Sequence, residues 1–186
     1  MVPVMSLWLP ILLSAVVVFI ASTIIHMWLP YHRTDYAKAP GEDDLMEALR
    51  RAGVAPGDYV VPHAGSMAAM KDPAFVEKMK RGPIAIMTVM AGREPSMAKN
   101  LVQWFIFLLV VAVFAAYIAG RALGPGAEYL SVFRFAGATA FVAYTLAGWP
   151  ESIWYQRKWS TTIKNTLDGL VYGLLTGGMF GALWPA

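Results

Sequence analysis

The sequence predicts an all-α integral membrane protein with four transmembrane helices and a small α+β domain outside the membrane, between the first and second helices. Hydrophobic residues make up 58% of the 186 residues and charged residues 15%, with a mean hydropathy of +0.51. Typical soluble domains are about 45–50% apolar and about 25% charged. The apolar residues are gathered into long blocks instead of being spread at the spacing of a soluble core. The composition therefore excludes a soluble enzyme, a fibrous repeat and a disordered chain.

Four apolar blocks meet or approach the length that a membrane crossing requires. A hydrocarbon core of about 30 Å needs about 20 helical residues. The first block has no charge before Arg33 and lacks both the basic start and the Ala-x-Ala site of a cleaved signal peptide, so we expect it to be retained. The cluster 160–162 offers hydroxyl caps for the last helix. The predicted transmembrane helices are 4–27, 101–120, 129–149 and 162–184.

Aromatic and basic residues predict how these helices sit in the membrane. Thirteen of the fifteen lysines and arginines lie in the segment 31–99 or just before and within the start of the fourth helix. The positive-inside rule therefore predicts a cytoplasmic loop 31–99 and two outer termini. A bacterial inner (plasma) membrane is the expected location, and membrane lipid an expected partner. Interfacial aromatic anchors are expected at Trp8, Trp28, Tyr31, Trp149, Trp154, Tyr155, Trp159 and Trp184.

The loop 31–99 is long and patterned enough to form its own small domain. Acidic residues from Glu42 and basic residues to Arg51 predict a helix, and a second helix is predicted from Asp72 to Arg81. The runs 59–61 and 84–90 predict two strands that could pair antiparallel. So small a domain has little hydrophobic core, and we expect it to pack against the membrane surface, a second copy of the chain or a partner protein.

The fourth predicted helix carries glycines at every fourth position. Glycine costs about 1 kcal/mol relative to alanine in a helix, so four of them forgo roughly 4 kcal/mol. Close packing against another helix would offset this cost, either within the chain or between subunits. Small residues at the same spacing occur in the second predicted helix, at Ala112, Ala116 and Gly120, and the third helix offers small residues at Ala136, Ala140 and Ala143. The alternative is that the helix face with the glycines lines a path for a substrate or an ion. The four glycines are Gly169, Gly173, Gly177 and Gly181.

Three charged residues fall within the predicted helices. Lys164 and Asp168 share one helix face, which predicts a polar clasp or, alternatively, a proton or ion site. Arg134 is expected to extend to the outer headgroups, or else to pair with Glu128 or an anionic lipid.

The three histidines are the remaining ligand-binding candidates. His26 and His32 are six residues apart, which fits neither helix-face spacing, and no carboxylate completes a recognised metal pattern. His63, with Met67 and Met70, would suit copper only in an oxidising space, which the predicted topology argues against. The sequence has no cysteine, no nucleophile elbow and no phosphate loop. No catalytic residue, metal or cofactor is therefore expected, and the dispersed charges argue against nucleic acid.

These features predict a non-enzymatic membrane protein, a subunit or accessory of a larger membrane assembly, with a membrane-protein partner or further copies of itself. One alternative is a small oligomeric channel or transporter with Arg134, Lys164 and Asp168 near its path. Another is a lipid-acting membrane enzyme that uses His26, His32 and Asp168, because all three are predicted at similar depth near the cytoplasmic face.

Overall fold

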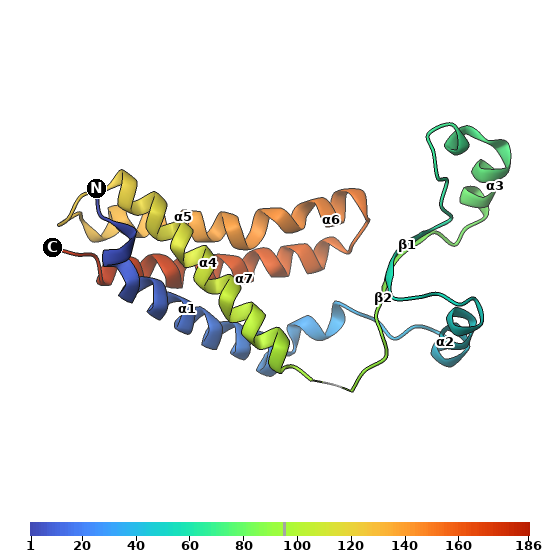
Figure 1. Ribbon diagram of the computed structural model, residues 1–186, viewed down its shortest axis with the longest axis horizontal. Coiled ribbons are helices and arrows are strands. Elements are labelled where there is room, and N and C mark those ends of the chain that lie inside the picture. Colours follow the sequence, from blue (N-terminus) through green and yellow to red (C-terminus); the bar gives the residue numbers. More distant parts are fainter. Residues whose placement is uncertain (95) are drawn as a thin grey trace. The chain divides into compact units, whose positions relative to one another are not determined.

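The computed structural model describes residues 1–94 and 96–186 and divides into two compact units. The helical unit comprises Met1–Ala37 and Ser96–Ala186, and the insert comprises Lys38–Pro95. Figure 1 shows the elements of each unit.

Five α-helices build the helical unit. Its first helix, α1, is preceded by a 3-10 turn, Val4–Leu7, and continues into a π-helical turn, Ile24–Trp28. A further 3-10 turn, Leu146–Gly148, connects α5 to α6. The helices are α1 (Trp8–Thr23), α4 (Ala98–Ala122), α5 (Tyr129–Thr145), α6 (Trp149–Trp154) and α7 (Trp159–Ala182).

Three helical stretches are long and apolar enough to cross a membrane: Val4–Trp28, Ala98–Ala122 and Tyr129–Trp154. They confirm the prediction of a mostly helical chain with the composition of a membrane protein. The third extends past the predicted end at residue 149, because α6 continues the helical path. The fourth predicted span, 162–184, lies mostly in α7, which is not among the three. Its polar residues and five glycines lower its hydropathy.

The hydroxyl cluster 160–162 does not cap α7, and this prediction was wrong. The helix begins at Trp159, and its N-cap residue, Lys158, makes no side-chain capping hydrogen bond. The Thr162 hydroxyl instead lies 2.6 Å from the Ser152 hydroxyl in α6. It therefore connects the two helices on either side of the turn.

The glycines of α7 lie against α5, and the two helices run side by side (Figure 1). A Cβ atom at Gly177 would lie 2.7 Å from the Phe133 carbonyl oxygen, and one at Gly173 would lie 3.0 Å from that of Gly137. A Cβ atom at Gly169 would overlap the Thr145 side chain, and one at Gly181 would overlap the Tyr129 ring. Because these approaches occur within one chain, close α5–α7 contact requires no second subunit.

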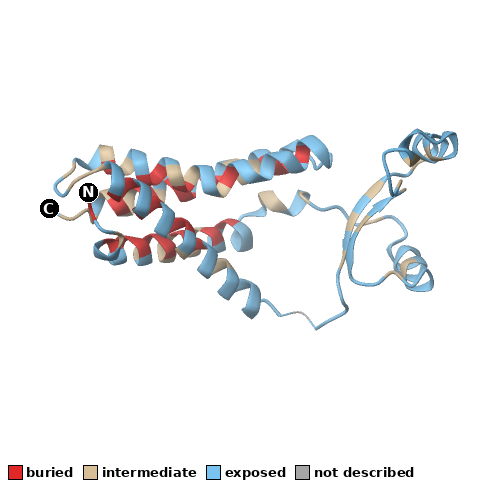
Figure 2. Ribbon diagram, turned by 45° about the horizontal axis from the view of Figure 1, so that its top comes forward, coloured by how far each residue is buried: buried red, intermediate tan, exposed pale blue. Residues whose placement is uncertain are grey.

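The buried residues follow the interior of the helical unit (Figure 2). Ala112 and Ala116 of α4 belong to a core that also contains Leu7 and Phe180. Gly120 faces the backbone of Val2 rather than α5. The chain termini lie at the end of the unit where α4 finishes and α5 starts, as two backbone hydrogen bonds show. These are Val2 N to Gly120 O, at 2.8 Å, and Gly126 N to Pro185 O, at 2.9 Å.

The insert confirms the predicted small α+β unit between the first two long helices. Its two strands pair antiparallel, with Tyr59 opposite Met87. The Asp72 side chain caps α3 by accepting a hydrogen bond of 2.7 Å from the Ala74 amide. None of the described residues 38–94 is buried. The elements are α2 (Glu42–Arg51), β1 (Gly57–Val61), a 3-10 turn (Ala69–Lys71), α3 (Pro73–Arg81) and β2 (Ala85–Val89).

Candidate functional site

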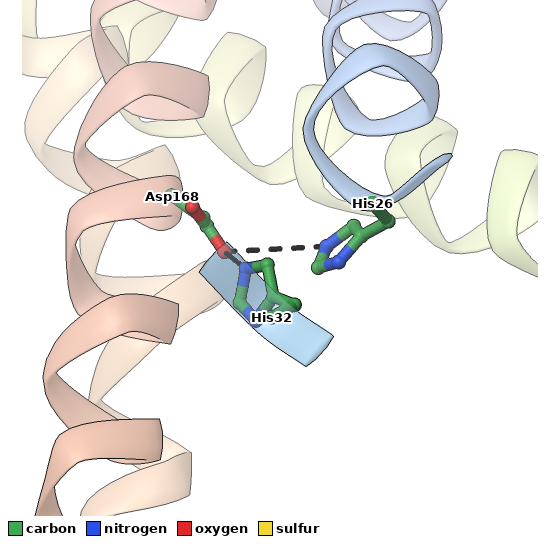
Figure 3. A group of neighbouring side chains, drawn as sticks. All are labelled: His26, His32 and Asp168. Atoms are coloured by element: carbon green, nitrogen blue, oxygen red, sulfur yellow. Dashed lines mark hydrogen bonds and ion pairs between the residues drawn. The ribbon is translucent and has the colours of Figure 1, made fainter. Parts of the chain in front are cut away.

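Ionisable side chains from three segments meet in the helical unit. The segments are the π-helical turn after α1, the following 3-10 turn Pro30–Thr34 with its C-cap residue Asp35, and α7. Figure 3 shows three of these side chains, with both imidazoles approaching a carboxylate that projects from α7. We name the group the polar cluster; it consists of His26, Tyr31, His32, Asp35, Lys164 and Asp168.

The backbone between His26 and His32 explains how two histidines six residues apart become neighbours. The π-helical turn ends at Trp28, Leu29 is extended, and Pro30 starts a new turn. The two ring centroids lie 4.5 Å apart. The spacing of residues on a helix face does not apply to this pair, because no single helix connects the two residues.

Asp168 is the carboxylate at the centre of the cluster and is only 3% exposed. Its Oδ1 atom accepts a hydrogen bond from the Tyr31 hydroxyl, and its Oδ2 atom lies 2.8 Å from His32 Nε2. The same Oδ2 atom is 4.0 Å from His26 Nε2. A buried carboxylate needs such partners, because its desolvation is otherwise costly. Within the described residues, every buried polar side-chain atom has a partner.

Asp35 is a second carboxylate, on the other side of the His32 ring. Its Oδ2 atom lies 2.7 Å from His32 Nδ1, and its Oδ1 atom accepts a hydrogen bond of 2.8 Å from Lys164 Nζ. Burial alone would raise the pKa of Asp35, but the hydrogen bonds from Lys164 and His32 lower it below its usual value. His32 therefore bridges two carboxylates.

Tyr31 is held as a hydrogen-bond donor. Burial, together with the hydrogen bond to Asp168 and its negative charge, raises the pKa of the phenol. The hydroxyl therefore keeps its proton at physiological pH and donates a hydrogen bond to the carboxylate.

The expected clasp between Lys164 and Asp168 is not what the structure shows. Lys164 Nζ bonds to Asp35, to the Thr34 hydroxyl at 2.9 Å and to the Tyr31 carbonyl at 2.5 Å. It forms no ion pair with Asp168 in the part of the chain that the structure describes. Because Lys164 reaches across to the 3-10 turn, it fastens that turn to α7.

His26 connects the polar cluster to an open cavity beside it. Its side chain is 46% exposed, and its Nε2 atom lies 3.5 Å from the Tyr172 hydroxyl. The cavity has a volume of about 460 Å³ and lies between the end of α1 and the start of α4. The wall is almost entirely apolar. It is formed by Phe19, Ser22, Thr23, His26, Met27, Met97, Leu101 and Trp104.

Arg134 and His63 do not join the polar cluster. Arg134 is exposed and lines a different cavity, of about 260 Å³, beside Gly137 and Gly173. His63 is an exposed residue of the insert. Across residues 1–94 and 96–186, neither side chain forms an ion pair.

Sequence reasoning grouped His26, His32 and Asp168 by membrane depth alone, and it missed Tyr31 and Asp35. The sequence signal for these two residues is the polar run that follows Pro30, in which a histidine and an aspartate are three residues apart. One ligand atom of each of His26, His32 and Asp168 lies within 4.8 Å of the others, so these three residues could hold a metal ion.

Comparison of the chain with models of known protein families, with curated proteins and with solved structures gave no match. The class of protein is therefore set by the three apolar helices, which indicate a membrane protein.

Proposed function

We propose that this chain is an integral membrane enzyme that acts on a lipid, with the polar cluster as its centre. The observation that carries the proposal is the half-exposed imidazole of His26. It lies both beside the buried carboxylate of Asp168 and in the wall of an apolar cavity. An apolar cavity with a few convergent polar groups is the usual form of a ligand site. An acyl chain would occupy the cavity and leave the headgroup near the cluster.

The proposal includes α7 as a fourth transmembrane helix. Its 24 residues would extend about 36 Å at about 1.5 Å per residue, enough for a hydrocarbon core of about 30 Å. Its polar Asp168 and the glycines Gly169, Gly173 and Gly177 are buried, whereas three leucines are exposed: Leu167, Leu170 and Leu174. Such a division suits a helix with one face on protein and one on lipid. The basic residues favour outer termini and a cytoplasmic polar cluster. The proposal keeps a bacterial inner membrane as the location.

Hydrolysis of a lipid ester is the reaction class that the available groups suit best. The hydroxyls of Ser22 and Thr23, in the cavity wall, both donate to the Phe19 carbonyl, at 2.9 Å each. We therefore assign the role of nucleophile to water. The water oxygen bonds to the ester carbon and the ester C–O bond breaks. The proton taken from water is returned to the leaving oxygen, which yields an acid and an alcohol. Imidazoles and carboxylates are suited to this proton transfer.

Measurement of fatty acid release tests the proposal. The full chain, purified in mild detergent, is mixed with phosphatidylethanolamine and phosphatidylglycerol, and mass spectrometry follows the free fatty acid. We expect His26→Ala and His32→Ala to lose release and His63→Ala, the matched control, to retain it. Equal release by the His26→Ala variant, or no release by the unchanged chain, would contradict the proposal.

A second candidate, a subunit or accessory of a membrane assembly, is favoured by the insert. None of its described residues is buried, and a two-stranded sheet is marginally stable by itself. A partner protein or further copies of the chain would stabilise it. Mass measurement after purification in mild detergent should then give a stoichiometric companion or an oligomer, and a stable lone monomer would contradict this candidate.

The channel or transporter alternative has less support. It requires Arg134 and the pair of Lys164 and Asp168 along one path, yet Arg134 lines a different cavity from the one beside His26. Lys164 and Asp168 are also occupied by separate hydrogen-bond partners.

A further inference from the structure

We propose that His26, His32 and Asp168 bind one divalent metal ion of the zinc type. The inference deepens the proposed function and rests on it only for the use of the metal, since metal binding can be measured without any lipid.

The donor atoms are of the right kind and nearly at the right separation. Zinc takes imidazole nitrogen and carboxylate oxygen at about 2.0–2.2 Å, so tetrahedral ligand atoms lie about 3.4 Å apart. The Asp168 Oδ2 atom lies 2.8 Å from His32 Nε2 and 4.0 Å from His26 Nε2. These two separations fall on either side of the required value. All three ligand atoms lie within 4.8 Å of one another, so side-chain shifts of about 1 Å would bring them to ligand distance.

The two more buried ligands each have a partner that orients them. The His32 ring has Asp35 at its Nδ1 atom, 2.7 Å away, which leaves Nε2 directed at Asp168. Metal-binding histidines usually place a carboxylate at their second nitrogen in this way. The Tyr31 hydroxyl bonds to Asp168 Oδ1, so Oδ2 is the carboxylate oxygen that faces the imidazoles.

The charges around the site favour a cation. The cluster contains two carboxylates, Asp35 and Asp168, against the single charge of Lys164, which is already paired with Asp35. With neutral imidazoles, the group carries a net negative charge that a divalent ion would more than offset.

The site supplies three protein ligands, so a tetrahedral ion would keep a fourth position without one. Catalytic zinc sites have three protein ligands and an open position for water or substrate, whereas structural sites are closed by four. The open position would face the cavity beside the half-exposed His26. A zinc-bound water is acidic enough to act as a nucleophile near neutral pH, which is what ester hydrolysis requires.

Zinc titration of the metal-free protein tests the inference. The untagged full chain in mild detergent is stripped with a chelator, desalted and titrated with Zn²⁺ by calorimetry. Elemental analysis after gel filtration then gives the stoichiometry. We expect one zinc per chain for the unchanged protein and for His63→Ala, and at least tenfold weaker binding for His26→Ala and His32→Ala. Asp35→Asn, which keeps all three proposed ligands but changes the carboxylate that partners His32 and Lys164, should weaken binding about 10–100-fold.

A cobalt spectrum provides a second measurement that depends on the ligands themselves. Co²⁺ in a tetrahedral site of nitrogen and oxygen donors gives visible absorption, and the His26→Ala variant should lose it while keeping its elution volume. Zinc binding that is absent from the unchanged chain, or equal in His26→Ala, would overturn the inference. Zinc binding without fatty acid release would sustain the metal site and contradict the lipid function. Release that persists after chelation would overturn the role of the metal in it.

Discussion

At the residue scale, the buried carboxylate of Asp168 depends on the hydroxyl of Tyr31. Removal of that hydroxyl leaves a carboxylate that is only 3% exposed with one donor fewer. An unsatisfied buried group costs about 1–3 kcal/mol, and more if charged. We expect Tyr31→Phe to lower the melting temperature in detergent and Tyr36→Phe, at a tyrosine that is 82% exposed, to leave it unchanged. Equal melting of the two variants would contradict the role of Tyr31.

Gly177 and Gly178 provide a matched pair for the contact between α5 and α7. A Cβ atom at Gly177 would lie 2.7 Å from the Phe133 carbonyl oxygen, whereas one at Gly178 would meet only the Tyr129 hydroxyl, at 3.6 Å. Alanine gains up to about 1 kcal/mol of helix propensity at either site, and overpacking costs about 1–3 kcal/mol. We expect Gly177→Ala to lower the melting temperature and Gly178→Ala to preserve or raise it. Higher stability of Gly177→Ala would show that the two helices are not in close contact there.

At the element scale, Lys164 fastens the turn Pro30–Thr34 to α7. Hydrogen bonds to charged groups contribute about 1.5–3 kcal/mol, and Lys164 makes three to this turn and Asp35. We expect Lys164→Met to speed amide hydrogen exchange in residues 29–36. Lys158→Met is the control, because Lys158 makes a single bond of 3.5 Å to the Thr34 carbonyl. Unchanged exchange in the Lys164 variant would contradict this role.

Local patterns predicted most elements because those elements depend on nearby residues. The acidic start and basic end of α2, and the Asp72-Pro73 start of α3, act through the helix terminus itself. The hydroxyls at 160–162 failed as predicted caps because Thr162 has a partner in α6. A tertiary contact of this kind has no local signature.

The polar cluster was predictable only in part, for a related reason. The sequence predicted that His26, His32 and Asp168 lie at similar depth in the membrane, and this grouped them. The partners of Asp168, however, depend on the break at Leu29 and on the return of the chain at Pro30. The same break places Asp35 between His32 and Lys164, which makes a pairing of Lys164 with Asp168 unnecessary.

At the scale of the whole molecule, α7 decides whether the chain crosses the membrane three times or four. By composition, α7 is not among the helices that could span a membrane. Its 24 residues are nevertheless long enough to span one, and it packs along α5. If α7 crosses, Tyr155, before it, and Ala186, after it, face opposite sides of the membrane. The chain has no cysteine, so single introduced cysteines can be labelled without background.

The most direct test therefore labels Tyr155→Cys and Ala186→Cys, each as a single cysteine, in intact cells with a membrane-impermeant maleimide. Both positions are exposed. With outer termini and four crossings, Ala186→Cys reacts in intact cells, whereas Tyr155→Cys reacts only after the membrane is opened. Glu128→Cys, in the loop between α4 and α5, should behave like Ala186→Cys. Reaction of positions 155 and 186 from the same side would contradict a membrane-spanning α7.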